Sequence, residues 1–219
     1  MQENPRFFLD LDVTMLPAYW AAACGELSDA DPVMAGLIAA YPGASLQSRG
    51  DVFGTLARSI VGQQISVKAA DSVWARFVER VEEVAPPRLL ALGFEGLEGC
   101  GLSQRKREYL LDLAGHFVSG ALDPGHWPQL DDAAIIAELT AVRGIGRWTA
   151  EMFLIFNLMR PDVYPLDDIG LQRAVGRHYL DRDKATRGEL VELGLRWRPW
   201  RSVATWYLWR SLDPVPVEY

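Results

Sequence analysis

Two adjacent carboxylates, Asp167 and Asp168, stand directly before an apolar pattern of helical spacing in the segment VYPLDDIGLQRAV. A carboxylate at the start of a helix lies among N–H donors and at the positive end of the helix dipole, which are surroundings suited to a negative charge. Such a carboxylate can stabilise a developing positive charge or activate a water molecule. The alternative is that one of the two acids only caps the helix, and for an isolated Asp-Asp pair that alternative is the better one.

Two glycines separated by one residue, Gly144 and Gly146, lie between two helical patterns in LTAVRGIGRWTAEMF. Asp131 to Thr140 is predicted to form one helix and Arg147 onward a second, with VRGIG as the turn between them. Glycine allows positive φ and carries no side chain, so the N–H groups at the start of the second helix could approach an anion such as a phosphate. The alternative is a close turn without a ligand, since short glycine motifs are weak evidence.

The elements around these motifs are predicted to be helices. Apolar residues recur at spacings of three and four, whereas alternating patterns are nearly absent. The one strand-like segment, RFFLDLDV, is too short and isolated to make a sheet. Residues that commonly cap helices precede five of the patterns, namely Asp51, Ser66, Ser103, Asp131 and Asp183. We therefore expect an all-α fold of about ten helices, arranged as two helical lobes with a cleft between them.

The 219 residues, 49% of them hydrophobic, suffice for one substantial core. We expect residues 1–219 to form a single compact helical unit. The first lobe is predicted over 51–165 and contains a pair of helices joined by the glycine turn at 131–158. The second lobe is predicted to combine 1–50 with 166–219, and it carries the helix after Asp168 and the aromatic-rich C-terminal helices.

Composition excludes several classes of protein. A net charge of −7 argues against a protein that coats nucleic acid non-specifically, although it leaves room for a small basic footprint. The two cysteines, Cys24 and Cys100, can build neither a disulfide framework nor a four-cysteine cluster. The three histidines lack metal-ligand spacing, so no cofactor is expected. With no signal-like start and no membrane-length apolar stretch, the expected location is the cytoplasm, at the nucleoid in a bacterium, without membrane contact.

Four segments, in this order, resemble those of the helix-hairpin-helix DNA glycosylases, most closely the alkylation-repair branch called 3-methyladenine DNA glycosylase II. They are SIVGQQISVKAA, LTAVRGIGRWTA, VYPLDDIGLQRAV and RWRPWRSVATWYLW. The resemblance runs from Asp51 to Leu212. The longer family members carry an N-terminal β-rich domain, and the 50 residues before Asp51 are too few and too helical in pattern to make one. A compact form without that domain is therefore expected.

The resemblance also implies roles for individual residues. The hairpin glycines and Arg173 align Asp168 with the catalytic acid of the family, which leaves Asp167 as a capping or supporting residue. Trp148 and Trp209 match aromatic positions of the family's base pocket. An indole face stacks well on a cationic alkylated purine, so this match is chemically reasonable.

The residues expected to contact DNA lie in the glutamine turn and the hairpin: Gln63, Gln64, Ile65, Arg143, Gly144, Ile145, Gly146, Arg147 and Thr149. Arg105 and Lys106 would extend the basic face. A side chain inserted from the minor groove would replace the stacking of a rotated-out base, and we expect Gln64 at the tip. The alternative is a core Ile65 with solvated glutamines. In the family the hairpin carbonyls also bind a monovalent cation, and the matching carbonyls for Na⁺ or K⁺ are those of Thr140, Val142 and Ile145.

Trp148 stands where the strand-cutting relatives have a lysine that forms a Schiff base. The four C-terminal cysteines that hold an iron–sulfur cluster in several of those relatives have no counterpart in this sequence. The resemblance thus implies a monomeric, monofunctional DNA glycosylase without lyase activity. It would flip out and excise alkylated bases such as 3-methyladenine and 7-methylguanine from damaged double-stranded DNA. The alternatives are a non-catalytic binder of DNA structures and a glycosylase for deaminated or oxidised bases.

Overall fold

The computed structural model describes residues 17–48 and 50–212, and every regular element in this part of the chain is a helix. The α-helices are α1 (Trp20–Ala30), α2 (Pro32–Ala40), α3 (Val52–Gly62), α4 (Val67–Val81), α5 (Pro86–Gly96), α6 (Gln104–Ser119), α7 (Asp132–Ala141), α8 (Arg147–Phe156), α9 (Ile169–Tyr179), α10 (Arg187–Gly194) and α11 (Arg201–Leu212), with one 3₁₀ turn at Trp127–Gln129. The predicted all-α fold is confirmed. The strand-like segment RFFLDLDV lies outside the described residues. None of the described helices is long and apolar enough to cross a membrane.

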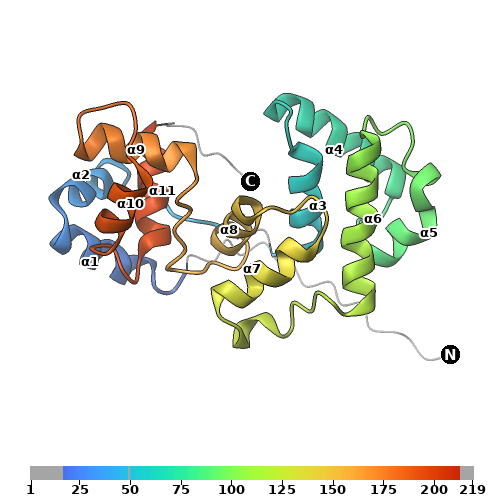
Figure 1. Cartoon of the computed structure of the whole chain (residues 1–219), viewed down its shortest axis with the longest axis horizontal. Coiled ribbons are helices and arrows are strands. Elements are labelled where there is room, and N and C mark those ends of the chain that lie inside the picture. Colours follow the sequence, from blue (N-terminus) through green and yellow to red (C-terminus); the bar gives the residue numbers. More distant parts are fainter. Residues whose placement is uncertain (1–16, 49, 213–219) are drawn as a thin grey trace.

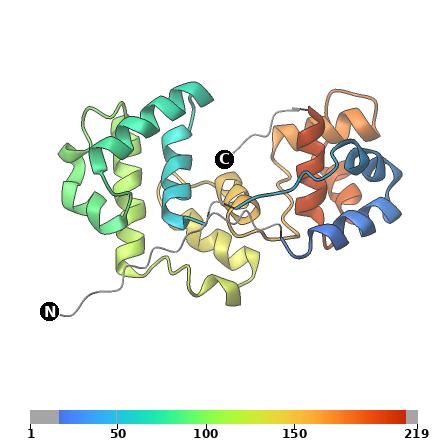
Figure 2. The ribbon, with the colours of Figure 1, turned by 180° about the vertical axis from the view of Figure 1, so that it is seen from behind.

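The helices form two groups with the pair α7 and α8 between them (Figure 1). Helices α3 to α6 pack on one another on one side, and α1, α2, α9, α10 and α11 pack on one another on the other. Parts near the two ends of the described chain therefore build one lobe together. Seen from behind, the chain after α2 leaves this lobe and runs toward α3 in the other (Figure 2).

Short polar residues begin the helices as the sequence predicts at four of five positions. The side chains of Asp51, Ser66, Ser103 and Asp131 each accept a hydrogen bond from a backbone N–H in the first turn of the helix that follows. The fifth prediction, Asp183, is wrong. Helix α10 begins after Thr186, whose hydroxyl accepts from Glu189 N while the Glu189 carboxylate accepts from Thr186 N. This reciprocal pair satisfies two backbone donors at once, which a lone Asp183 three residues earlier cannot do.

A buried carboxylate fixes the lobe that carries α9. Asp31, 3% exposed, precedes α2 and accepts hydrogen bonds at both oxygens. Its Oδ1 accepts from Val33 N (2.9 Å) and Met34 N (3.2 Å), and its Oδ2 accepts from Tyr179 Oη (2.9 Å) and Trp197 Nε1 (3.0 Å). A buried charge is tolerated when its acceptor positions are filled in this way. Asp31 thereby holds the C-terminal end of α9 against α2 and the chain before α11.

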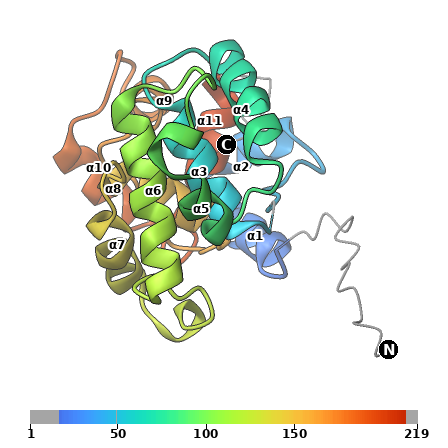
Figure 3. The same ribbon diagram turned by 90° about the vertical axis from the view of Figure 1, so that its right-hand side faces the viewer.

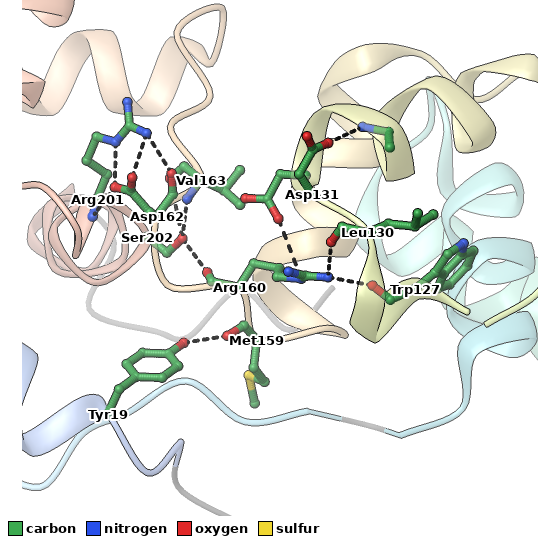
Figure 4. Close-up of polar contacts among 12 residues, drawn as sticks. Tyr19, Trp127, Leu130, Asp131, Met159, Arg160, Asp162, Val163, Arg201 and Ser202 are labelled. Carbon is green, nitrogen blue, oxygen red and sulfur yellow. Dashed lines mark hydrogen bonds and ion pairs between the residues drawn. The ribbon is translucent and has the colours of Figure 1, made fainter. Parts of the chain in front are cut away.

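The connector, defined as residues 159–163 between α8 and α9, is held by the central part of the fold on one side (Figure 4). Arg160 Nη2 donates to the carbonyl oxygens of Trp127 (2.7 Å) and Leu130 (3.0 Å). Arg160 Nε lies 3.5 Å from a carboxylate oxygen of Asp132 at the start of α7. The guanidinium therefore fastens the connector to the segment that leads into the hairpin.

On its other side, the connector is held by the start of α11, which belongs to the lobe of α9 (Figure 4). Arg201 donates from Nε to Asp162 Oδ1 (2.6 Å) and from Nη2 to Asp162 Oδ2 (2.9 Å). Ser202 Oγ donates to the Arg160 carbonyl (2.6 Å) and accepts from Val163 N (2.9 Å). A bidentate guanidinium–carboxylate pair is among the geometrically stricter contacts in proteins, so the connector has little freedom at either end.

Candidate active site

Three helices converge on the carboxylate of Asp168, which lies at the N-cap of α9. Its Oδ1 accepts hydrogen bonds from Leu171 N (2.6 Å) and from the indole Nε1 of Trp209 on α11 (2.8 Å). Its Oδ2 accepts from the indole Nε1 of Trp148 on α8 (2.9 Å). The structure thus brings together the predicted acid and both predicted pocket tryptophans. Trp148 comes from the second helix of the hairpin and Trp209 from the C-terminal helix.

The two oxygens of Asp168 are not equivalent. A carboxylate oxygen has two lone pairs, and Oδ1 uses both on Leu171 and Trp209. Oδ2 accepts from Trp148 and retains a second acceptor position. Trp148 is 39% exposed and Ile169, the next residue after the acid, is 58% exposed, so this side of the carboxylate borders solvent. Oδ2 is therefore the oxygen that can meet a substrate or a water molecule.

The two tryptophans differ in their surroundings. The ring of Trp209 stacks on Phe156 at the end of α8, with centroids 5.7 Å apart and planes 13° from parallel. One face of Trp209 is thus covered within the protein, and its N–H is used on Asp168. Trp148 is the more exposed of the two indoles. Stacking on a ligand accordingly suits Trp148 better, whereas Trp209 holds the acid in place.

Gly170 is a site residue that sequence reasoning missed. A Cβ at this position would lie 3.1 Å from Asp168 Oδ1, 3.1 Å from Trp209 Cδ1 and 3.2 Å from Trp209 Nε1. These separations are tighter than ordinary contacts to a methyl group, so the indole reaches the carboxylate because residue 170 has no side chain. The sequence offered no signal, because a glycine in the first turn of a helix has many uses.

Asp167 does not cap the helix, which corrects the expectation for this residue. The cap is Asp168 itself, since its side chain accepts from Leu171 N. Asp167 is exposed and forms an ion pair with Arg187 at the start of α10. The physical reason is position: only the residue directly before the first helical residue has its carboxylate over the free N–H groups of that turn.

An ion pair between Arg147 and Glu151 lies on α8 next to Trp148. Arg147 Nε donates to Glu151 Oε1 at 2.9 Å, and Glu151 is buried. Burial raises the pKa of the Glu151 carboxyl, and the adjacent Arg147 opposes that shift. The Arg147 side chain as a whole is 66% exposed, which leaves guanidinium N–H groups facing solvent. Arg147 is thus held at one end and available to an anion at the other.

The hairpin turn between α7 and α8 uses its two glycines differently. Gly144 has a φ of +89°, and a Cβ there would lie 2.2 Å from the ring of Tyr109 on α6. Gly146 has a φ of −89°, is the N-cap of α8 without a side-chain cap, and has no atom within 4 Å of the place where a Cβ would stand. Of the positive φ that both glycines allow, the turn uses only that of Gly144. Gly146 has no side chain with which to cap the first N–H groups of α8.

The other hairpin residues divide between surface and core. The Arg143 guanidinium donates to Glu108 (3.0 Å), and its backbone N donates to Asp112 Oδ2 (2.8 Å), so this residue is turned toward α6. Ile145 and Val142 are buried. Their side chains belong to the core, and only main-chain atoms of these two residues can meet a ligand. Thr149 is half-buried on α8.

The turn between α3 and α4 presents an exposed tip. Gln64 is exposed and has a φ of +59°, Ile65 is 40% exposed and Val67 is 73% exposed. The alternative with Ile65 in the core is therefore wrong. Gln63 is half-buried, and its side-chain Nε2 donates to the Gly144 carbonyl in the hairpin at 2.7 Å.

Comparison with models of protein families matches residues 57–199 to the HhH-GPD superfamily of base excision DNA repair proteins. The chain belongs to this superfamily. A putative DNA-3-methyladenine glycosylase of Bacillus subtilis is 33% identical over 170 residues, which are 74% of this chain and 59% of that protein. DNA-3-methyladenine glycosylase 1 of Schizosaccharomyces pombe is 32% identical over 78% of this chain and 76% of its own.

Solved structures agree with these relatives. A DNA-3-methyladenine glycosidase from Bacillus halodurans superposes with a TM-score of 0.78 at 33% identity, over 86% of this chain and 87% of the other. A 3-methyladenine DNA glycosylase from Schizosaccharomyces pombe, in complex with abasic DNA, gives 0.74 at 29% identity, over 90% of this chain and 98% of the other. The resemblance to the 3-methyladenine glycosylase branch is confirmed.

Proposed function

We propose that the protein is a monofunctional DNA glycosylase that excises alkylated bases, such as 3-methyladenine and 7-methylguanine, from double-stranded DNA. The observation that carries the proposal is the carboxylate of Asp168, held by the indole N–H groups of Trp148 and Trp209, with a second acceptor position left at Oδ2. The names of its relatives, and the abasic DNA bound to one of them, support the same chemistry. We further propose that it works as a monomer in the cytoplasm.

The proposed chemistry follows from the charge that develops during bond cleavage. Breaking an N-glycosidic bond leaves positive charge on the sugar, and a nearby carboxylate stabilises that charge or activates water on the opposite face. Asp168 enters the reaction already oriented, because three N–H donors hold it and nothing must reorganise as the charge appears. The products are the free base and an intact strand with an abasic sugar.

Trp148 would select the base. An alkylated purine carries a positive charge and binds over an electron-rich ring face more strongly than a neutral base does. The N–H of Trp148 is directed at Asp168, so the ring orientation is set by the same contact that holds the acid. The hydrogen bond between Trp148 and Asp168 would thus orient both the ring that stacks on the base and the carboxylate that acts in catalysis.

The hairpin would hold the DNA backbone. The N-cap of α8 is Gly146, which brings no side chain to the start of the helix, and the exposed guanidinium of Arg147 adds a positive charge next to it. The carbonyls of Thr140, Val142 and Ile145 fit a Na⁺ or K⁺ ion, because neutral oxygen donors suit such hard cations. The Val142 carbonyl accepts from Ile145 N (3.1 Å) and has a second lone pair available. A bound cation would add positive charge facing a phosphate.

The proposal is tested on a panel of duplexes that each carry one modified base. We expect release of alkylated bases, and strand breaks only after alkali, because Trp148 has no amine with which to form a Schiff base. Borohydride should trap no covalent complex. A trapped complex would contradict the monofunctional assignment. Release confined to deaminated or oxidised bases would shift the substrate class, and binding without any release would make the protein a DNA-structure binder.

Gly170→Ala is expected to lower the rate of base release without lowering the stability of the protein. Alanine favours a helix over glycine by up to about 1 kcal/mol, so α9 should not be weakened. The new methyl, however, would crowd Asp168 Oδ1 and the Trp209 indole. We expect an unchanged or higher melting temperature together with a loss of roughly tenfold in single-turnover base release.

Gly188→Ala is the matched control. Gly188 is also the second residue of its helix, α10, and no atom lies within 4 Å of the place of its Cβ. This variant should keep wild-type turnover. Equal turnover of the two variants would show that the close contact at Gly170 has no part in positioning the acid.

A further inference from the structure

One side chain ties the turn before α4 to the hairpin. Gln63 follows the last residue of α3, and its Nε2 donates to the carbonyl of Gly144, 81 residues further along the chain, at 2.7 Å. Gly144 has a positive φ and packs so close to the ring of Tyr109 that a Cβ there would lie 2.2 Å from it. The hydrogen bond therefore joins the exposed turn to a closely packed point of the hairpin.

Helix α6 contacts both the end of α3 and the hairpin turn. Lys106 Nζ donates to the Val61 carbonyl in the last turn of α3 at 2.7 Å, and burial lowers the pKa of this lysine. Six residues later, Asp112 Oδ2 accepts from the backbone N of Arg143 in the hairpin (2.8 Å). Figure 3 shows α6 with α3 on one side and α7 and α8 on the other. Lys106 is thus used inside the protein, and not as the free phosphate ligand that its sequence position suggested.

The conformation of Gln64 needs this support. A residue with a side chain seldom adopts a φ of +59°, since the left-handed region crowds its Cβ, and the conformation persists where neighbours enforce it. The preceding residue is Gln63, whose side chain is held by the hairpin, and the following residues are exposed. The anchor at Gln63 is the contact closest in sequence that can hold the tip in this conformation.

We propose that Gln63 is a positioning residue that couples the Gln64 tip to the DNA-gripping hairpin. The inference rests on the proposed function. Through this one hydrogen bond the tip sits at a fixed place relative to the backbone grip, so binding of the hairpin to a phosphate presents Gln64 to the base stack. Gln63 acts from inside the protein, and the neighbouring Gln64 is the residue that enters the DNA.

The test compares Gln63→Met, which keeps length and shape but has no N–H donor, with Gln64→Ala and the double variant. Unstacking is measured by the fluorescence of 2-aminopurine placed next to an abasic-site analogue in a duplex. We expect Gln63→Met to reduce the fluorescence increase on binding at least twofold and single-turnover release about tenfold. Affinity for undamaged duplex should stay within about twofold, because the hairpin grip is intact.

Additivity decides between coupling and direct contact. If Gln63 acts through Gln64, the double variant should lose no more fluorescence or turnover than Gln64→Ala alone. Additive losses, or an equal loss of affinity for undamaged duplex in Gln63→Met, would make Gln63 a DNA contact and overturn the proposal. So would wild-type fluorescence in Gln63→Met. Because the fluorescence test needs no base release, a protein that excises nothing would refute the proposed function while leaving this test readable.

Discussion

Replacing Asp168 with asparagine is expected to lower the rate of base release by about 10²-fold or more while the protein stays folded. Asparagine caps helices about as well as aspartate, so α9 keeps the acceptor for Leu171 N. The amide, however, carries no charge and has a single acceptor atom for the three N–H groups that now converge on the carboxylate. Single-turnover release of 7-methylguanine from a duplex measures the effect.

The neighbouring carboxylate supplies the control. Asp167→Asn also removes a negative charge close to the start of α9. The Asp167 side chain, however, is exposed and pairs with Arg187. Exposed ion pairs contribute little to stability, so turnover within about twofold of wild type is expected. A near-normal rate for Asp168→Asn, or equal losses in both variants, would remove Asp168 from the mechanism.

Replacing each hairpin glycine with alanine is expected to have a different effect: Gly144→Ala should lower stability, and Gly146→Ala should lower DNA affinity. Gly144→Ala would force a side chain into the left-handed region and place its methyl 2.2 Å from the Tyr109 ring. Backbone strain and overpacking together should lower the free energy of unfolding by about 2 to 5 kcal/mol. Urea denaturation followed by tryptophan fluorescence measures this loss.

Gly146→Ala should fold normally, because its φ is negative and no atom lies within 4 Å of the new methyl. The methyl would stand at the start of α8, where a phosphate held by the hairpin would have to approach the N–H groups. We expect affinity for damaged and undamaged duplex to fall by similar factors, since a phosphate contact carries no base information. Fluorescence anisotropy of a labelled duplex measures both affinities.

Salt dependence tests the same contact in the wild-type protein. A small basic face on a chain of net charge −7 should neutralise about three to five phosphates, which gives a log–log slope of about −3 to −4.5. A slope near −10, or a Gly146→Ala protein that binds normally, would show that the phosphate grip lies elsewhere.

The features that the sequence predicted well are local ones. The hairpin boundaries, four helix caps and the position of Asp168 at a helix start depend on residues within one turn of one another. The exception among the caps is instructive. Asp183 has the right residue type, but Thr186 has Glu189 three residues later and forms the reciprocal pair. Residue type alone could not rank the two candidates.

The features that could not be predicted are contacts between distant segments. Nothing near Gln63 in the sequence indicates that its amide meets Gly144, and nothing near Gly170 shows that the Trp209 indole needs the space. The stacking of Phe156 on Trp209 likewise depends on how α8 and α11 meet. The family motifs placed Gln63, Gly144 and Trp209 in the site, whereas the contacts among them and the parts of Gly170 and Phe156 became visible only once the helices were packed.

The connector between α8 and α9 has a consequence for how lesions are found. Arg160 fastens it to the hairpin side, and the Arg201–Asp162 pair fastens it to the lobe of α9. If the hairpin holds a phosphate as proposed, the spacing between it and Asp168 would be largely set before DNA arrives, and the shape change would fall on the duplex. Base pairs that are already weakened cost less to open. We expect the mechanical softness of the DNA at each step to act as the first filter during search, ahead of any recognition of the extruded base by Trp148.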